Sequence, residues 1–344
     1  MVITSLAFMD GSFGALQSVS GRASVHATYG RAALIQVRQH SRPSARLLQQ
    51  GNRRSGPMFK NFLVPITGGP GDGVVLATAR LAAQAFAAHL EFLHVRVDTT
   101  EVLMSMTAAG VGGGDAVQAV IDRMETEADA LAASARAGAM AMLDEAGIAL
   151  RDSPSGPGAS AQFSQEQGHR SAWVAQYGRF ADLVLMGRGT EEDSAREVLE
   201  AALMDTGKPL LIAPSSAPAS LGQRVVIAWK DTPEAARAVS AALPFIGRAQ
   251  QVSIISVIDD ADRPDPSGAR LLRALRWHNA AVELRQVPSD GATAVEVLHR
   301  EAAALSADLL VMGGYSHSRL RQVVFGGFTR STLGHAAVPV LMAH

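Results

Sequence analysis

A seven-residue segment that occurs twice constrains the fold of this chain more than any other feature. Ala-Asp-Leu-Val-Leu-Met-Gly at residues 181–187 recurs as Ala-Asp-Leu-Leu-Val-Met-Gly at residues 307–313. A second pair follows in the same order, with Lys-Pro-Leu-Leu-Ile-Ala at 208–213 and Val-Pro-Val-Leu-Met-Ala at 338–343. Because both segments recur at nearly the same spacing, the chain is predicted to contain two copies of one domain.

Short runs rich in Val, Ile and Leu alternate with longer Ala-rich stretches from Met58 to the end of the chain. This alternation indicates an α/β fold, and near-continuous apolar strands indicate a parallel sheet with helices on both faces. The sequence therefore predicts two tandem doubly wound, five-stranded parallel-sheet domains of the flavodoxin-like or Rossmann-like type. The expected strands are Phe62–Ile66, Leu90–Val97, Ala161–Phe163, Leu183–Met186 and Pro209–Ala213, then Arg224–Trp229, Val252–Val257, Val282–Val287, Leu309–Met312 and Pro339–Met342. The helices expected between them include Val74–Ala88, Ala116–Ala146, Pro233–Leu243, Ala292–Ser306 and Ser318–Ala336.

The composition excludes several classes of function. The chain has no cysteine, so it has no disulfide framework, no thiolate metal site and no cysteine nucleophile. Its formal net charge of −1 argues against a nucleic-acid partner, which requires a clustered basic excess. Its longest apolar runs, such as residues 308–313, are far shorter than the roughly 20 residues that span a bilayer. We therefore expect a soluble chain without a nucleic-acid or membrane partner.

The first 57 residues differ in composition from the rest of the chain. They contain seven arginines and a single acidic residue, Asp10. They lack the continuous apolar stretch of a secretory signal, although an Arg-rich, acid-poor segment is also typical of transit peptides. We expect residues 1–57 to be a disordered or mis-annotated leader, with the folded chain beginning at Met58.

A segment of small residues separates the two copies. It is Ser-Ser-Ala-Pro-Ala-Ser-Leu-Gly at 215–222, a composition typical of a linker. The predicted domains are therefore residues 58–215 and residues 222–344. The first domain is enlarged by a Gly- and Met-rich segment near residues 103–115.

Glycines follow the fourth strand of the second copy, in Gly-Gly-Tyr-Ser-His-Ser-Arg at 313–319 and in Gly-Gly-Phe-Thr at 326–329. In an open doubly wound sheet the ligand lies beyond the carboxyl ends of the strands, where the strand order reverses. Glycines there let backbone N–H groups approach phosphate oxygens, and a helix N-terminus favours the anion. The same glycines also suit an ordinary tight turn. The pattern alone leaves both interpretations open.

The two copies together resemble a tandem universal stress protein. Nucleotide-binding members of that family carry the motif G-x2-G-x9-G-[ST] after strand four. Gly313, Ser316, Gly326 and Gly327 reproduce its spacing here, but Ser316 replaces the second glycine and Gly327 replaces the Ser or Thr. Two further segments are similar to the family: Ile-Ala-Trp-Lys at 227–230 and Val-Pro-Val-Leu-Met at 338–342.

The resemblance implies that an adenine nucleotide, ATP, binds to the second copy only. The residues that it assigns to the nucleotide site are Ala228, Trp229, Lys230, Val257, Met312, Gly313, Ser316, Gly326, Gly327 and Thr329. Lys230 stands where the family commonly has an acidic residue, and it is either a phosphate ligand or a solvated loop charge.

The resemblance also implies a cytoplasmic stress-response protein without catalytic residues, which associates with itself or with other proteins. Together with the duplication it predicts an intramolecular pseudo-dimer, with the closing strands 209–213 and 339–342 near the contact. Two alternatives remain. One is a structural or interaction protein with a vestigial site, and the other is a slow ATP hydrolase.

The first copy departs further from the motif. Three acidic residues at 191–193 follow Gly187, where they would repel a triphosphate, and no Gly-[ST] pair stands at the motif spacing before Pro209. Its first strand leads into Thr67 instead of the family's acidic residue. We interpret this copy as degenerate and structural.

Other candidate residues have weaker support. His317 and His335 flank the motif loop, but no group of His, Asp and Glu has the spacing of metal ligands, so no metal site is predicted. Asp182 and Asp308 precede strand four in both copies. Their recurrence favours a loop or capping role.

Overall fold

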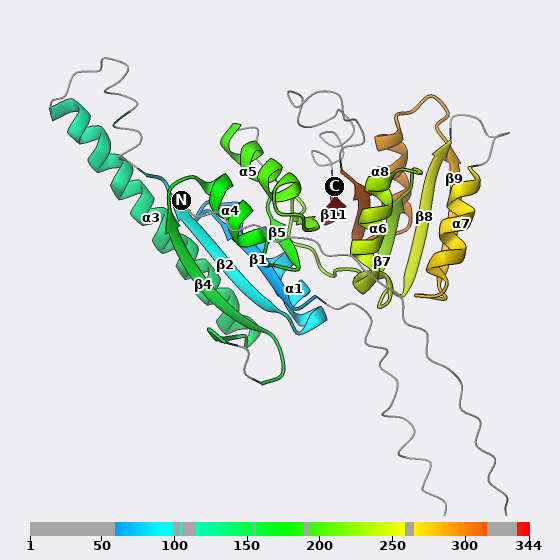
Figure 1. Ribbon diagram of the computed structural model, residues 1–344, viewed down its shortest axis with the longest axis horizontal. Coiled ribbons are helices and arrows are strands. Elements are labelled where there is room, and N and C mark those ends of the chain that lie inside the picture. Colours follow the sequence, from blue (N-terminus) through cyan, green and yellow to red (C-terminus); the bar gives the residue numbers. More distant parts are fainter. Residues whose placement is uncertain are drawn as a thin grey trace, which may run out of the picture. The chain divides into compact units, whose positions relative to one another are not determined.

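The structure is a computed structural model (Figure 1), and it describes residues 59–98, 104, 115–153, 156–188, 193–258, 265–314 and 336–344. The expectations for residues 1–57 lie outside this part of the chain. Within it, no helix combines the length and the apolar character needed to cross a membrane. The same described ranges contain no group of three His, Cys, Asp or Glu side chains placed to hold a metal ion.

Strands and helices alternate through both copies, as Figure 1 shows. The elements of the first copy are β1 (Asn61–Ile66), α1 (Asp72–Phe86), β2 (His89–Arg96), α3 (Asp115–Ala146), β3 (Ala149–Leu150), β4 (Ser160–Gln167), α4 (Arg170–Gly178), β5 (Leu183–Met186), α5 (Asp193–Met204) and β6 (Leu210–Ile212). Those of the second copy are β7 (Arg224–Ala228), α6 (Pro233–Ile246), β8 (Gln251–Ile258), α7 (Pro266–Leu275), β9 (Val282–Pro288), α8 (Ala294–Ala304), β10 (Leu309–Gly313) and β11 (Val340–Ala343).

The described strands form one sheet with the order β3-β4-β2-β1-β5-β6-β11-β10-β7-β8-β9. Within each copy the strands pair in parallel. Apart from the two-residue strand β3, both copies have the same order, β4-β2-β1-β5-β6 matching β9-β8-β7-β10-β11. The predicted fold of two tandem doubly wound parallel sheets is therefore confirmed.

Helices cover both faces of the sheet. One core cluster contains residues of α1, α3, α6 and α7, and the other contains residues of α4, α5 and α8. Successive residues of β10 alternate between them, with Val311 in the first cluster and Leu310 and Met312 in the second. Because both faces are buried, the central strands are apolar at every position, which explains their strong sequence signal.

The third long strand of the first copy differs from its prediction. The sequence indicated only residues 161–163, whereas β4 extends from Ser160 to Gln167 and pairs with β2 along its whole length. Its sequence, Ser-Ala-Gln-Phe-Ser-Gln-Glu-Gln, is mostly polar, and most of its side chains are half-buried or exposed. A strand near the end of a sheet does not need an apolar residue at every position. Periodicity alone therefore underestimates its length.

In each copy, an aspartate lies just before the fourth strand (β5 or β10). It accepts hydrogen bonds from the start of the first strand (β1 or β7). Asp182 accepts hydrogen bonds from two consecutive backbone N–H groups where β1 begins, at 2.7 and 3.0 Å. Asp308 accepts two equivalent bonds where β7 begins, at 3.1 and 2.8 Å, and a third from the Ser220 hydroxyl at 2.6 Å. The predicted loop or capping role of the recurring aspartate is confirmed, since each copy's aspartate accepts the backbone N–H groups at the start of strand one.

Replacing Asp308 by alanine should lower the free energy of unfolding by about 2 kcal/mol, because backbone donors lose a charged acceptor in a buried position. Asp182→Ala should cost about 1 kcal/mol or less, since Asp182 is exposed and water can replace it. Urea unfolding of the full chain measures both values. Equal losses for the two variants would contradict this account.

The two copies meet along their closing strands. β6 and β11 pair antiparallel, with Ile212 opposite Val340. The copies also meet through aromatic rings: Phe86 from α1 packs edge-to-face on Phe245 from α6 at 4.8 Å, and Phe59 lies 5.7 Å from Phe245. The predicted contact near the closing strands is therefore confirmed, and aromatic packing adds to it.

Candidate functional site

The strand order of the second copy reverses between β7 and β10. β8 and β9 lie on the far side of β7, whereas β11 lies on the far side of β10. The carboxyl ends of β7 and β10 therefore form a topological switch point, the place where open α/β sheets bind their ligands. Ala228 of β7 is opposite Met312 of β10, and Gly313 is the last residue of β10. The fold brings these three predicted site residues together from distant parts of the sequence.

The predicted residues differ in how their side chains are placed. Lys230 is exposed, whereas Ala228, Trp229 and Val257 are half-buried at the ends of β7 and β8. Met312 is 2% exposed and belongs to the core cluster under α4, α5 and α8. Its side chain therefore packs in the core beneath the strand end and does not face a ligand. The remaining predicted residues lie outside the described part of the chain: Ser316, Gly326, Gly327 and Thr329.

Gly313 has a packing role of its own. A Cβ atom at this position would lie 2.6 Å from the backbone nitrogen of Ala235 and 2.8 Å from the carbonyl carbon of Glu234. Only glycine lets β10 pass this close to the first turn of α6. The next N–H group, that of Gly314, donates to the carbonyl of Ala343 at 2.9 Å. The first glycine of the motif therefore has a structural reason to be present even without a ligand.

The N-terminus of α6 offers few donors to an anion. The helix begins with Pro233, which has no N–H, and the Thr232 side chain accepts a bond from the N–H of Ala235 at 3.2 Å. Glu234 adds a negative charge to the first turn, and Arg237 pairs with it at 3.1 Å. The start of α6 therefore gives little support to an anion at this edge of the sheet.

A chain of hydrogen bonds fixes Trp229 against the N-terminus of α7. Its indole N–H donates to the Ser267 hydroxyl at 2.9 Å, and that hydroxyl donates to the Asp265 carboxylate at 2.6 Å. The Ser256 hydroxyl donates to the same carboxylate at 3.2 Å. Burial raises the pKa of Asp265, but the hydrogen bonds from Ser267 and Ser256 outweigh burial and leave the pKa below its usual value. The carboxylate is held ionised at neutral pH.

Sequence reasoning missed the partners of Trp229. Asp265 is the N-cap of α7, and Pro266 occupies the first turn of that helix. An N-cap aspartate followed by proline is a helix-start pattern that a closer inspection of the sequence could have found. The contact with Trp229 itself has no local signal, because it joins residues 38 positions apart.

In the first copy, the loop after β1 corresponds to the loop between β7 and α6. Its backbone donors are already bonded to groups of the protein. The Asp72 carboxylate accepts bonds from the backbone N–H groups of Thr67 and Gly68, the shortest at 2.7 Å, and from the Thr67 hydroxyl at 3.1 Å. α3 covers the loop, since a Cβ on Gly68 would lie 2.0 Å from the Leu131 carbonyl oxygen. Ser134 of α3 also donates to the carbonyl of Gly68 at 2.9 Å. The donors of this loop are therefore used within the protein.

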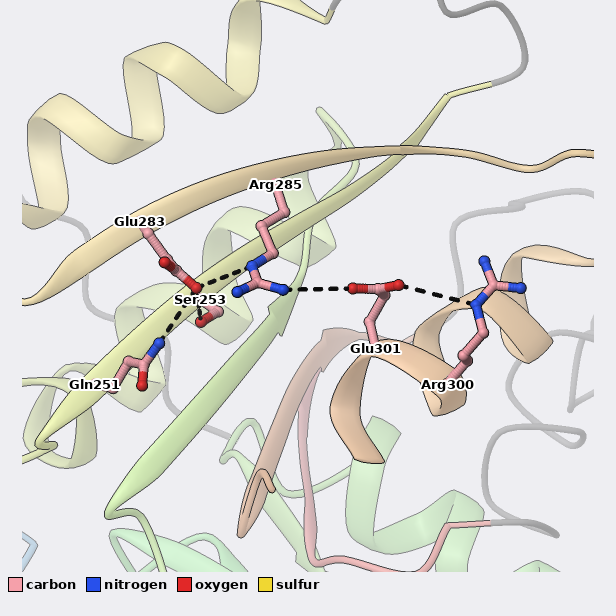
Figure 2. A network of polar contacts seen from close by, with 6 residues as sticks. All are labelled: Gln251, Ser253, Glu283, Arg285, Arg300 and Glu301. Atoms are coloured by element: carbon pink, nitrogen blue, oxygen red, sulfur yellow. Dashed lines mark hydrogen bonds and ion pairs between the residues drawn. The ribbon is translucent and has the colours of Figure 1, made fainter. Parts of the chain in front are cut away.

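A separate polar network joins β8, β9 and α8 (Figure 2). Glu283 accepts hydrogen bonds from Ser253 at 2.8 Å, Gln251 at 3.2 Å and Arg285 at 3.0 Å. Arg285 also lies 3.8 Å from Glu301 of α8. Burial raises the pKa of Glu283, but Ser253 and Arg285 lower it by more, so the carboxylate stays ionised. The network links β9, the last strand of the sheet, to β8 and α8. It does not include residues of the switch point.

Comparison with known proteins matches the second copy to a family. Residues 222–344 match the model of the universal stress protein family. The chain is similar in structure to a universal stress protein from Archaeoglobus fulgidus, with a TM-score of 0.61 and 17% identity over 83% of this chain and 97% of that chain. It is also similar to a protein of unknown function from Pseudomonas aeruginosa, with a TM-score of 0.50 and 15% identity over 83% of this chain and 92% of that one.

At these identities the structural likeness concerns the fold. None of the curated protein sequences matches the chain. The family assignment therefore rests on the second copy, where the family model, the strand order and the glycine at the end of β10 coincide. Residues 222–344 are a universal stress protein domain within a tandem α/β fold.

Proposed function

We propose that residues 222–344 bind one adenine nucleotide, ATP, at the carboxyl ends of β7 and β10. The protein would act in a cytoplasmic stress response as a binding protein and not as an enzyme, with other proteins or further copies of itself as partners. One observation carries the proposal. Gly313 ends β10 at the switch point, and Ser316, Gly326 and Gly327 follow at the family's motif spacing.

The residues around the switch point support distinct roles toward a nucleotide. Lys230 is exposed and can pair with phosphate oxygens. Ala228 and Val257 give apolar surface at the ends of two strands. Backbone N–H groups of the glycine motif would cradle the phosphates, and the Ser316 hydroxyl can donate a further hydrogen bond. We assign no side chain to the hydrolysis of the bound ATP.

An interaction protein with a vestigial site is the second candidate. Two observations favour it: the donors at the start of α6 are largely satisfied within the protein, and Gly313 packs against that helix. Both features give predicted site residues a purely structural reason to be present. Titration with ATP separates the two functions.

Variants of the motif test the proposal by isothermal titration of the full chain with ATP. Gly326→Val should abolish binding, because a β-branched side chain blocks the backbone's approach to phosphate. Ser316→Gly restores the second glycine of the family motif and should tighten binding about tenfold or less if the motif requires a positive φ at this position. Gly187→Ala in the first copy is the control, since its new Cβ would meet only the end of the Val75 side chain, at 3.2 Å.

The control variant should bind ATP as the unchanged chain does. If neither the unchanged chain nor Ser316→Gly gives heat on titration or displaces a labelled analogue, the nucleotide proposal fails. The interaction protein with a vestigial site would then stand.

A further inference from the structure

We infer that the exposed face of α7 binds the N-terminal half of α3 in a second copy of this chain. The contact would join three arginines and Trp277 of one molecule to a row of carboxylates and an apolar stripe of the other. The inference rests on the self-association within the proposed function, to which it adds the surface, and it needs no bound nucleotide.

The outer face of α7 carries basic residues and no acidic ones. Residues 266–278 contain three arginines and neither Asp nor Glu. Arg270, Arg273 and Arg276 are exposed and recur every three residues, so they lie along one side of the helix. None of the three guanidinium groups forms an ion pair with a residue that the structure describes. Their charges are therefore available to a partner.

Trp277 extends this basic face with a large aromatic surface. It is 84% exposed, the highest value among the exposed large hydrophobic residues of the described chain. The inner face of α7 is already used, since Leu275 is 2% exposed and belongs to the core. Trp and Arg are enriched among the residues that contribute most to protein interfaces. The outer face of α7 thus has the composition of a protein-binding site.

The size and charge of this face favour a protein over a nucleic acid or a lipid surface. Nucleic-acid binding depends on the neutralisation of many phosphates, and lipid-binding segments cluster about four to eight Lys or Arg. Three arginines over about 9 Å, in a chain of net charge −1, fall short of both. An acidic protein surface of similar length needs only a matching row of carboxylates.

The N-terminal half of α3 extends beyond the core of the first copy. α3 has 32 residues, but its buried positions begin only at Ala132, and no residue from 117 to 131 is buried. Ile121 and Met124 are half-buried, and Val120 is 43% exposed. This half of the helix therefore presents an apolar stripe that its own copy does not fully cover.

A row of carboxylates runs beside this stripe. Residues 115–131 contain five acidic residues and one basic residue. Asp122 and Glu125 are exposed and directly follow two residues of the stripe, so they lie about 100° around the helix from it. Asp129 completes the row and also pairs with Arg96 at 2.6 Å. From Asp122 to Asp129 the row spans about 10 Å, so its length and charge match the arginine row of α7.

The fold allows both faces to be used in one dimer. α3 and α7 contribute to the same core cluster and so lie on one face of the sheet, where α3 packs on β2 and α7 packs on β9. These strands lie towards opposite ends of the strand order. If two molecules met on this face about a two-fold axis along the strands, α7 of each would lie on α3 of the other. The two contacts would be identical and the dimer closed.

Charge reversal tests the contact by sedimentation velocity of the full chain. Arg270→Glu with Arg273→Glu makes the face of α7 acidic, and Asp122→Lys with Glu125→Lys makes the face of α3 basic. In either variant alone, both contacts would oppose like charges, so dimerisation should weaken about tenfold or more. An equal mixture of the two variants should form a heterodimer, because both of its contacts again join opposite charges.

Removal of the aromatic surface gives a second test. Trp277→Ala should weaken dimerisation about tenfold. Phe180→Ala is the matched control, since Phe180 is 81% exposed and lies just after α4, away from both faces. Raising the salt concentration from about 0.1 to about 1 M should also weaken dimerisation, because exposed ion pairs are screened. Thermal midpoints show whether each variant is folded, and if a reversed variant is not, Trp277→Ala and the salt dependence decide.

A monomeric unchanged chain at high protein concentration, or a dimer that persists equally in both reversed variants, would overturn the inference. So would a monomer that binds phosphatidylserine vesicles or single-stranded DNA and loses that binding in Arg270→Glu with Arg273→Glu, because α7 would then serve another kind of partner. Titration with ATP separates this inference from the nucleotide proposal. A monomer that binds ATP contradicts only the dimer, and a dimer that binds no ATP contradicts only the nucleotide site.

Discussion

Replacing Phe245 by alanine is expected to lower the free energy of unfolding by about 3–5 kcal/mol. Phe245 of α6 is 2% exposed, and its ring lies 4.8 Å from Phe86 and 5.7 Å from Phe59, both from the first copy. The truncation loses buried apolar surface and leaves a cavity between the two copies. The interior around the ring is close-packed and relaxes only in part, so the cavity does not close completely.

Urea unfolding of the full chain measures this loss. Phe180→Ala is the matched control, because Phe180 is 81% exposed and its removal should change stability by less than about 0.5 kcal/mol. A double-mutant cycle with Phe86→Ala should give a coupling energy of about 1 kcal/mol, the value typical of an edge-to-face pair. If Phe245→Ala resembled the Phe180 control, the two copies would not share a core at this contact.

The Gly313→Val variant should lose about 3 kcal/mol of stability, at the upper end of overpacking effects. Its Cβ would lie 2.6 Å from the backbone nitrogen of Ala235 and 2.8 Å from the carbonyl carbon of Glu234. These are backbone atoms of a helix, so they cannot move aside as the end of a flexible side chain can. The cost is steric, because Gly313 is not among the residues with a left-handed backbone.

Thermal or urea unfolding again provides the measurement, with Gly73→Ala as the control. A Cβ on Gly73 in the first turn of α1 would meet nothing within 4 Å, so alanine there should stabilise the helix by up to about 0.5–1 kcal/mol. If Gly313→Val unfolds at the same urea concentration as the unchanged chain, β10 does not pass α6 as closely as described.

The fold was largely predictable because its main signals are local or repeated. Central strands such as β5 and β10 are buried on both faces, so every residue is apolar and the strands stand out in the sequence. The recurring Asp182 and Asp308 marked the same capping position in both copies. β4 was underestimated because its place near the end of the sheet permits polar residues.

The site was less predictable because its contacts are tertiary. A motif places Gly313 after a strand, but only the structure shows that α6 occupies the space beside it. The sequence likewise selects Trp229 as a site residue without showing that Ser267 and Asp265 orient its ring. Spacing predicts which residues share an edge of the sheet, whereas their hydrogen bonds depend on helices elsewhere in the chain.

The two copies differ at the equivalent edge of the sheet. In the first copy the Asp72 carboxylate already occupies the backbone donors of the loop after β1, and α3 covers that loop. In the second copy Lys230 is exposed beside the switch point and the glycine motif follows β10. The proposed nucleotide site therefore lies in residues 222–344 alone, and we expect one bound nucleotide per chain.

Native mass spectrometry of the full chain with ATP tests this assignment most directly, because it counts bound nucleotides per polypeptide. We predict one ATP per chain in the unchanged protein and none in Gly326→Val. Two nucleotides per chain, or one that persists in Gly326→Val, would contradict the assignment to the second copy. No bound nucleotide at ATP concentrations up to the millimolar range would contradict nucleotide binding altogether.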